Sequence, residues 1–317
     1  MDSQPIVVRV DSLSIQYGNR LAVQDVSFSV KAGEIFGLIG PNGAGKTSIV
    51  EAVAGLRPQA QISGAIRTCG FDPSIHQKQL KALVSVQLQE SAFPSRATVG
   101  DICALYENIY DHLGTTTSLL EEFGLSDRRS SLITALSGGL RQRLALVLAQ
   151  VGSAQLVVLD ELTTGLDPEQ RRATWKSVRR LATSGSSVLL TSHYMDEVEA
   201  LCARVGVLIQ GRIAFLGTPE QLIAKFGGGT RIIVNISELD ERVVERISGS
   251  SQFASVDQTE SRLTLTPSHS GSVEGALAAI AIEGISQSVI QFRSPTLEDA
   301  YVNLIERHEL EGAQKGV

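Results

Sequence analysis

The feature that most constrains this chain is a glycine-rich segment, Gly40-Pro41-Asn42-Gly43-Ala44-Gly45-Lys46-Thr47, with the pattern G-x-x-x-x-G-K-T. An apolar run at 35–39 precedes it and predicts a buried strand, and residues 48–54 follow at helical spacing. Strand, glycine-rich turn and helix form the context that a phosphate-binding P-loop requires. Lys46 could then reach the β- and γ-phosphates, and the Thr47 hydroxyl could ligate Mg²⁺. A glycine-rich turn that binds nothing is the alternative, but the flanks favour a nucleoside triphosphate site.

Composition sets limits on the partners of this chain. Its 317 residues allow two domains, and a net charge of −6 argues against broad nucleic-acid binding. The three cysteines are far apart and form no C-x-x-C pair, which favours free thiols over a disulfide framework or a metal site. No apolar stretch reaches the ~18 residues that span a bilayer, and the first nine residues do not resemble a signal peptide. We therefore expect any membrane role to depend on a partner.

Two further strands end in polar residues that suit the same site. The run 156–160 ends in Asp160, which could hold Mg²⁺, and Glu161 follows, where it could polarise an attacking water. The run 188–192 is followed by His193, which could sense the γ-phosphate. Taken alone, these residues would be read as a solvated turn and an ordinary polar histidine. The P-loop in the same chain favours the functional reading.

Two more residues have a weaker signal. Gln89 ends a strand-like run at 83–89 and could bridge Mg²⁺ and water as a neutral amide. Tyr17 lies in a turn between two strand candidates and could stack on a purine, although an ordinary turn aromatic is the alternative. Beyond Gln89 the pattern becomes helical, beginning at a Thr98 cap and continuing to about residue 150.

The order of these segments resembles one family, the ATP-binding cassette (ABC) ATPases. The decisive stretch is Leu136-Ser137-Gly138-Gly139, which is similar to the signature loop of that family. Tyr17 resembles its A-loop, residues 40–47 its Walker A motif, Gln89 its Q-loop, residues 156–161 its Walker B motif, Gly165-Leu166-Asp167 its D-loop, and His193 its switch histidine. The resemblance covers roughly residues 5–226. Leu140 and Leu162 depart from it, standing where glutamine and proline are usual.

The resemblance implies a fold, ligands and site residues. The fold is an α/β P-loop ATPase domain over residues 1–226, with a RecA-like core, a helical subdomain at about 90–150 and an antiparallel β subdomain. The ligands are ATP and Mg²⁺, with Mg²⁺ held by Thr47, Gln89 and Asp160. Glu161, His193 and Gln89 are implied as catalytic. The residues implied to bind the nucleotide are Tyr17, Gly40, Pro41, Asn42, Gly43, Ala44, Gly45, Lys46, Thr47, Ser48, Ser137, Gly138, Gly139 and Asp167.

The resemblance also implies partners. In this family the signature loop of a second subunit closes over the nucleotide, so a homodimer is expected, together with a separate membrane permease. The protein would then lie at the cytoplasmic face of the membrane through that permease. The tail 294–301 resembles export-type cassettes of the daunorubicin-resistance kind, which implies export of drugs, lipids or similar compounds. The alternatives are a cassette acting on ribosomes or DNA and a regulatory subunit that binds ATP without hydrolysing it.

The last part of the chain follows a glycine hinge at 227–229. Strand, helix, strand, strand, helix and strand are predicted in that order over 230–310, which is the ferredoxin-like order, and a final helix at 297–307 is capped by Thr296. No base stands near the many serines and threonines, so we expect an α+β regulatory or dimerisation domain rather than a second active site. A passive cap over apolar surface is the alternative.

Overall fold

The structure is a computed structural model, and it describes residues 4–56, 61–87, 94, 96–110, 114–236, 241–268, 273–282, 285 and 289–315. The chain divides into two compact units, Met1–Pro219 and Glu220–Val317. Helix α8 (Pro219–Phe226), predicted at the end of the first domain, is thereby grouped with the second unit. Within that unit, Asn303 Nδ2 donates to the Phe226 carbonyl at 2.8 Å.

The first unit is built on a six-stranded sheet in the order β5-β6-β7-β3-β8-β9. Its first five strands run parallel, and the last is antiparallel to its neighbour. The strands are β5 (Val84–Gln87), β6 (Leu156–Asp160), β7 (Ser187–Ser192), β3 (Ile35–Ile39), β8 (Arg204–Ile209) and β9 (Arg212–Gly217). Every residue of β3, β6 and β7 is buried, which explains why the sequences of these strands are mostly apolar.

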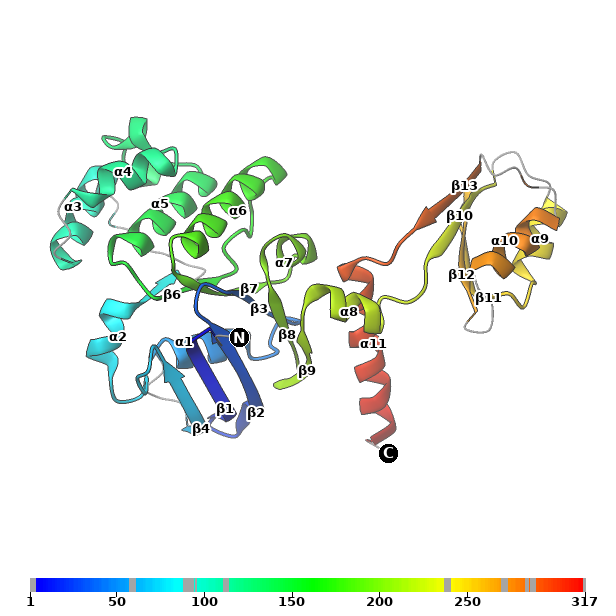
Figure 1. The fold of residues 1–317 in the computed structure, drawn as a ribbon, viewed down its shortest axis with the longest axis horizontal. Helices are drawn as coiled ribbons and strands as arrows, with labels where there is room; N and C mark the ends of the chain where they lie inside the picture. Colours follow the sequence, from blue (N-terminus) through cyan, green and yellow to red (C-terminus); the bar gives the residue numbers. More distant parts are fainter. Residues whose placement is uncertain are drawn as a thin grey trace. The chain divides into compact units, whose positions relative to one another are not determined.

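A second sheet and one helix cover one face of this sheet. The antiparallel order is β2-β1-β4, with β1 (Ile6–Tyr17), β2 (Arg20–Lys31) and β4 (Gln61–Thr68). Helix α1 (Lys46–Val53) lies between the two sheets, because Ile49, Val50 and Val53 share one buried cluster with side chains of both. The P-loop therefore begins at a fixed strand end and leads into a helix that is packed on two sides (Figure 1).

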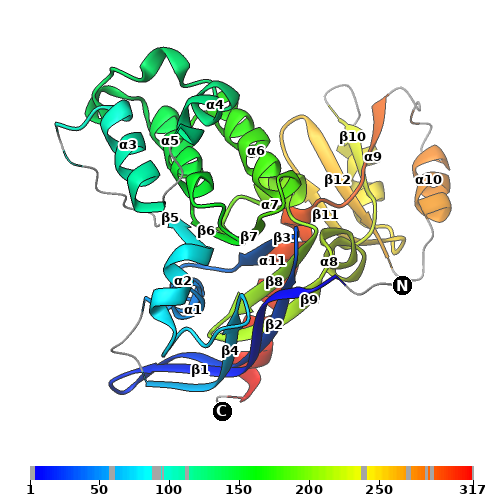
Figure 2. The same ribbon diagram turned by 60° about the vertical axis from the view of Figure 1, so that its left-hand side comes forward.

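Helices α5 (Gly138–Val151) and α6 (Pro168–Thr183) lie on the opposite face of the sheet (Figures 1 and 2). The other helices of this unit are α2 (Gln77–Leu83), α3 (Val99–Tyr110), α4 (Thr115–Glu122), α7 (Met195–Leu201) and the short 3-10 segments η1 (Ser126–Arg128) and η2 (Ile133–Ala135). The predicted Thr98 cap is confirmed, since the Asp101 amide donates to Thr98 Oγ1 at 3.1 Å. Helix α2 was not predicted, because it is short and buries only Leu80.

The second unit contains a four-stranded antiparallel sheet in the order β11-β12-β10-β13. Its elements follow the predicted order: β10 (Arg231–Asn235), α9 (Glu241–Ser248), β11 (Phe253–Gln258), β12 (Arg262–Pro267), α10 (Val273–Ile282), β13 (Ile290–Arg293) and α11 (Leu297–Lys315). Val234 and Leu265 of the sheet share one core with Ile247 of α9 and Ile280 of α10. Both helices therefore pack on the same face of this sheet.

Candidate functional site

The P-loop connects the end of β3 to the first turn of α1. Gly45 adopts φ 105°, and a Cβ at this position would lie 2.6 Å from the Ala22 carbonyl oxygen, so only glycine fits the turn. Lys46 is only 6% exposed, and its Nζ donates to the carbonyls of Gly40 at 2.8 Å and Pro41 at 3.2 Å. The P-loop carbonyls thus accept hydrogen bonds from the ammonium group of Lys46.

The charge of Lys46 lies in a strongly polar part of the core. Burial lowers the pKa of Lys46 from its usual value, and the nearby carboxylates of Glu161 and Asp160 oppose that shift by favouring the charged form. Attraction to two carboxylates therefore helps to keep a cation at the strand ends.

Asp160 ends β6 and is 4% exposed. Its two carboxylate oxygens have different donors: the Thr191 hydroxyl of β7 donates to Oδ1, and the Thr47 hydroxyl donates to Oδ2 at 3.4 Å. Hydroxyl and carboxylate oxygens are ligands that Mg²⁺ accepts. Thr47 and Asp160, predicted as metal ligands from distant segments, are brought together here.

Glu161 is the first residue beyond β6, and it has a left-handed backbone with φ 50°. Its amide donates to the Thr191 carbonyl at 3.2 Å and to the Thr191 hydroxyl at 3.1 Å, which holds this unfavourable conformation in place. Its side chain points toward the predicted histidine, with Oε1 3.7 Å from His193 Nδ1. Both side chains are partly exposed, at 15% for Glu161 and 40% for His193, so both remain open to a ligand.

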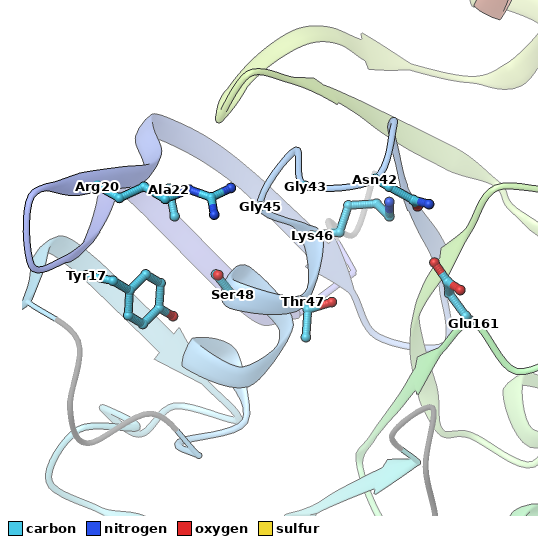
Figure 3. A pocket seen from close by; sticks show the side chains of 10 residues that line it. All are labelled: Tyr17, Arg20, Ala22, Asn42, Gly43, Gly45, Lys46, Thr47, Ser48 and Glu161. Carbon is cyan, nitrogen blue, oxygen red and sulfur yellow. The ribbon is translucent and has the colours of Figure 1, made fainter.

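A pocket of about 460 Å³ lies over the P-loop, and Figure 3 shows its lining side chains. Tyr17 and Arg20 reach it from the turn between β1 and β2, and Glu161 from the opposite side. The lining residues are Tyr17, Arg20, Ala22, Asn42, Gly43, Gly45, Lys46, Thr47, Ser48 and Glu161. Sequence reasoning missed Arg20. The available signal was a cation three residues after Tyr17, in the predicted turn between two strands.

The signature and D-loop residues form a separate group. Ser137 caps α5, its Oγ accepting from the Leu140 amide at 3.4 Å, and Asp167 caps α6, its Oδ1 accepting from the Gln170 amide at 2.9 Å. Ser137, Gly138, Gly139 and Asp167 are not among the lining residues of the pocket in Figure 3. The predicted residues Gly40, Pro41 and Ala44 do not line the pocket either, although they belong to the P-loop beneath it. Within the described residues of this single chain, the predicted nucleotide ligands therefore form two groups: Tyr17 with the P-loop, and the N-terminal turns of α5 and α6. Gln89, also predicted, lies outside the described residues.

A buried carboxylate that the sequence did not single out lies behind His193. Glu197 is 1% exposed, and it accepts from Ser192 Oγ at 2.5 Å and from Trp175 Nε1 at 3.2 Å. Burial raises the pKa of Glu197, and these two donors partly oppose that effect. The contacts tie the loop that carries His193 to helix α6.

Comparisons with known proteins bear on the family of this chain. Residues 23–164 match the family described as "ABC transporter". The chain is 30% identical over 309 residues to the linearmycin resistance ATP-binding protein LnrL of Bacillus subtilis (strain 168), covering 95% of this chain and 99% of that protein. It is 33% identical over 311 residues to the daunorubicin resistance ATP-binding protein DrrA2 of Streptomyces coeruleorubidus, with 94% of each chain covered.

Among solved structures, the fold is similar to an ATP-binding subunit of an ABC transporter, with a TM-score of 0.63 and 27% identity. That similarity covers 70% of this chain and 93% of the other. Since full-length relatives and the site geometry agree, the chain belongs to the ATP-binding proteins of ABC transporters and is an ATPase of that family.

Proposed function

We propose that this ATPase powers a separate membrane permease that exports drugs, lipids or similar compounds. The resistance proteins LnrL and DrrA2, which are similar over nearly the whole chain, support the export of toxic compounds. No helix among the described residues has the length and apolarity to cross a membrane. In this proposal the protein is held at the cytoplasmic membrane face by its permease.

The observation that carries the proposal is the convergence of Lys46 and Thr47, in the first turn of α1 after β3, with Asp160 and Glu161 at the end of β6. Lys46 binds phosphate oxygens, and Thr47 and Asp160 supply oxygen ligands whose placement fits Mg²⁺. Mg²⁺ bound there would neutralise charge on the phosphates. Gln89 remains a candidate third ligand from its sequence context.

Glu161 is placed to accept the proton of the attacking water, and His193 to orient that water or the γ-phosphate. The left-handed backbone of Glu161 turns its side chain out of the sheet and into the pocket. The 3.7 Å separation between Glu161 and His193 lets both groups face one small ligand. Tyr17 would stack on the base from the far end of the pocket.

The separation of the two ligand sets supports a site shared between two subunits. Ser137 and the Gly138 and Gly139 amides lie at the N-terminus of α5, where a helix favours an anion. In a homodimer they would bind the γ-phosphate held by the P-loop of the partner subunit.

Mixing two inactive variants tests this arrangement. Lys46→Ala and Ser137→Arg should each abolish ATP hydrolysis, whereas an equal mixture should recover about a quarter of the intact sites through heterodimers. Glu169→Gln, an exposed change in the first turn of α6, serves as the control. Mixtures as inactive as the single variants, under conditions where the subunits exchange, would contradict a shared site.

A groove in the helical region is our candidate for the permease contact. It has a volume of about 350 Å³ between β5, α3 and α5, and Ile102, Leu105 and Tyr106 line it. Leu105 is 50% exposed, although it shares a helix face with buried residues. Leu105→Asp should leave the ATPase activity of the isolated subunit intact but reduce transport and binding to the permease. Ile75→Asp, at a residue that is 74% exposed in another loop, is the matched control.

We also propose that the second unit is a ferredoxin-like domain with a regulatory or dimer-stabilising role. The strand order β11-β12-β10-β13, with α9 and α10 on one face, supports that fold. Because the contacts group α8 with this unit, a truncation should end at Thr218. A soluble fragment with unchanged ATPase rate but weaker dimerisation or transport would support regulation, whereas an aggregated fragment would support a passive cap.

A further inference from the structure

Near the N-termini of α5 and α6, the side chain of Gln170 connects the two helices. Gln170 lies in the first turn of α6, and its Oε1 accepts from the Gly139 amide at 3.2 Å. Its Nε2 donates to Asp167 Oδ2 in the same first turn. A single neutral amide group therefore joins the signature loop to the D-loop within one subunit.

The absence of a side chain at residue 139 leaves space for this contact. A Cβ on residue 139 would lie 2.5 Å from Gln170 Oε1 and 3.2 Å from the Gln170 Cβ and Cδ. Gly139 is not among the residues with positive φ, so its backbone conformation does not require glycine. The missing side chain instead makes room for the Gln170 amide.

The acceptors at the N-terminus of α5 are neutral and come from the same chain. The first N–H groups of a helix have no carbonyl partner within the helix. Here Ser137 Oγ accepts from Leu140, and Gln170 Oε1 accepts from Gly139. A phosphate is a stronger acceptor than a neutral amide at such a position, because it is charged and the helix dipole favours an anion.

We propose that Gln170 is a positioning residue that occupies the Gly139 amide until the γ-phosphate held by a partner subunit displaces it. The proposal rests on the shared site of the proposed function. When the phosphate takes the Gly139 N–H, the Gln170 oxygen is released, and the link between the signature loop and Asp167 opens. Closure of two subunits around ATP would thereby directly change the contacts of Asp167 in the D-loop.

Two substitutions at this position should act in opposite directions. Gln170→Met keeps the unbranched side chain but loses both hydrogen bonds, so nothing competes with the phosphate for the Gly139 amide. Its KM for ATP should fall about threefold to tenfold, the range that one exchanged neutral hydrogen bond covers. Gln170→Glu keeps the acceptor with a negative charge and repels Asp167, so its KM should rise about tenfold or more. The Asp167 cap of α6 uses the main-chain amide of residue 170 and is retained in both variants.

The test is the rate of ATP hydrolysis as a function of ATP concentration for the full chain with its permease. Glu169→Met, at an exposed neighbour in the same turn, is the matched control and should leave KM unchanged. A purely structural Gln170 would lower kcat and thermal stability in both variants without moving KM in opposite directions. Shifts of the same sign, or no shift, would overturn the proposal.

A second measurement does not depend on activity. In the ATP-free protein, Gln170→Met should speed hydrogen exchange of the Gly139 amide, while the exchange of the Leu140 amide, which Ser137 accepts, should change little. Unchanged Gly139 exchange would also overturn the proposal. If the Ser137→Arg variant hydrolyses ATP as fast as the parent protein, the shared site itself is contradicted. If Ser137→Arg abolishes activity but the Gln170 variants are silent, only the role of Gln170 fails.

Discussion

The N-termini of α1 and α5 are both glycine-rich helix starts, but they are built differently. At α1 the chain supplies a buried cation, Lys46. Its ammonium group donates to the P-loop carbonyls of Gly40 and Pro41, and the carboxylates of Asp160 and Glu161 favour its charge. At α5 the first turn has a serine cap and a glutamine acceptor, and neither group is charged. Both helix ends can bind phosphate, yet only the first has charged side chains arranged to hold the ligand and its metal.

The two helix ends also differ in the contacts that hold them in place. The charged half is fixed by bonds that cross the parallel sheet, such as those of Thr191 to Asp160 and Glu161. In the signature half, the Gly139 amide donates to Gln170, and under the proposed function its charged ligand would come from another subunit.

Glu161→Gln should have the largest effect. Removing a positioned base costs about 10²-fold or more in hydrolysis, whereas the amide preserves the shape of the pocket and hence ATP binding. Single-turnover hydrolysis and ATP-dependent dimerisation measure the two properties separately. Near-normal turnover would move the base role to another residue, with His193 as the first candidate.

Lys46→Met should come next and should separate ligand binding from folding. A saturating ligand at 100 times its Kd stabilises a protein by about 2.7 kcal/mol, and the variant should lose this ATP-dependent gain in thermal unfolding. Without ATP its stability should stay within about 1 kcal/mol of the parent, because the substitution also removes the cost of burying a charge. Lys31→Met, at an exposed lysine of β2, should keep the full ATP-dependent gain. A variant that ATP still stabilises would contradict the role of Lys46.

Arg20→Gln should weaken ATP binding by about twofold to fivefold, because an exposed charge contact contributes about 0.5–1 kcal/mol. A Cβ on residue 43 would lie 3.9 Å from Arg20 Nη2, so the guanidinium lies beside the phosphate loop. Because it is exposed, salt should weaken its contribution. Arg9→Gln on β1 changes the same charge away from the pocket lining and is the control. Equal ATP affinity in the two variants would remove Arg20 from the site.

Much of this site could be predicted because local sequence sets local geometry. The P-loop, the buried runs that became β3, β6 and β7, and the Thr98 and Thr296 caps each depend on neighbours in the chain. The Asp299 amide indeed donates to Thr296 Oγ1 at 3.2 Å at the start of α11. Parallel strands ending at one edge then bring Asp160 and the Thr47 hydroxyl together without further information.

The contacts that escaped prediction join residues far apart in sequence. Gln170 reaches Gly139 across 31 positions, and Trp175 reaches Glu197 across 22. No periodicity marks such pairs, since each depends on how two helices pack against the same sheet. The hydrogen bond from Asn303 to the Phe226 carbonyl of α8 is of the same kind, because the two residues are 77 positions apart in the sequence.

Glu197→Gln should have the smallest effect, visible only as a change in the pH dependence of stability. Burial raises the folded-state pKa of Glu197 above its unfolded value, so the folded protein holds this proton to higher pH than the unfolded chain. The contribution of Glu197 to stability is therefore greatest at low pH and declines as pH rises above the unfolded pKa toward the folded one. Glutamine has no such titration, although its amide disturbs the donors Ser192 and Trp175 at every pH.

The difference in unfolding free energy between variant and parent isolates the contribution of Glu197 titration to stability. It should shift in favour of the variant as the pH is raised above the unfolded Glu pKa of about 4.3. Trp175 is the only tryptophan of the chain and donates to Glu197, so its fluorescence can follow both unfolding and the local change. Glu199→Gln, at an exposed neighbour in α7, should show no comparable trend. A pH-independent difference would mean that Glu197 titrates alike in both states, and its buried contacts would then be only structural.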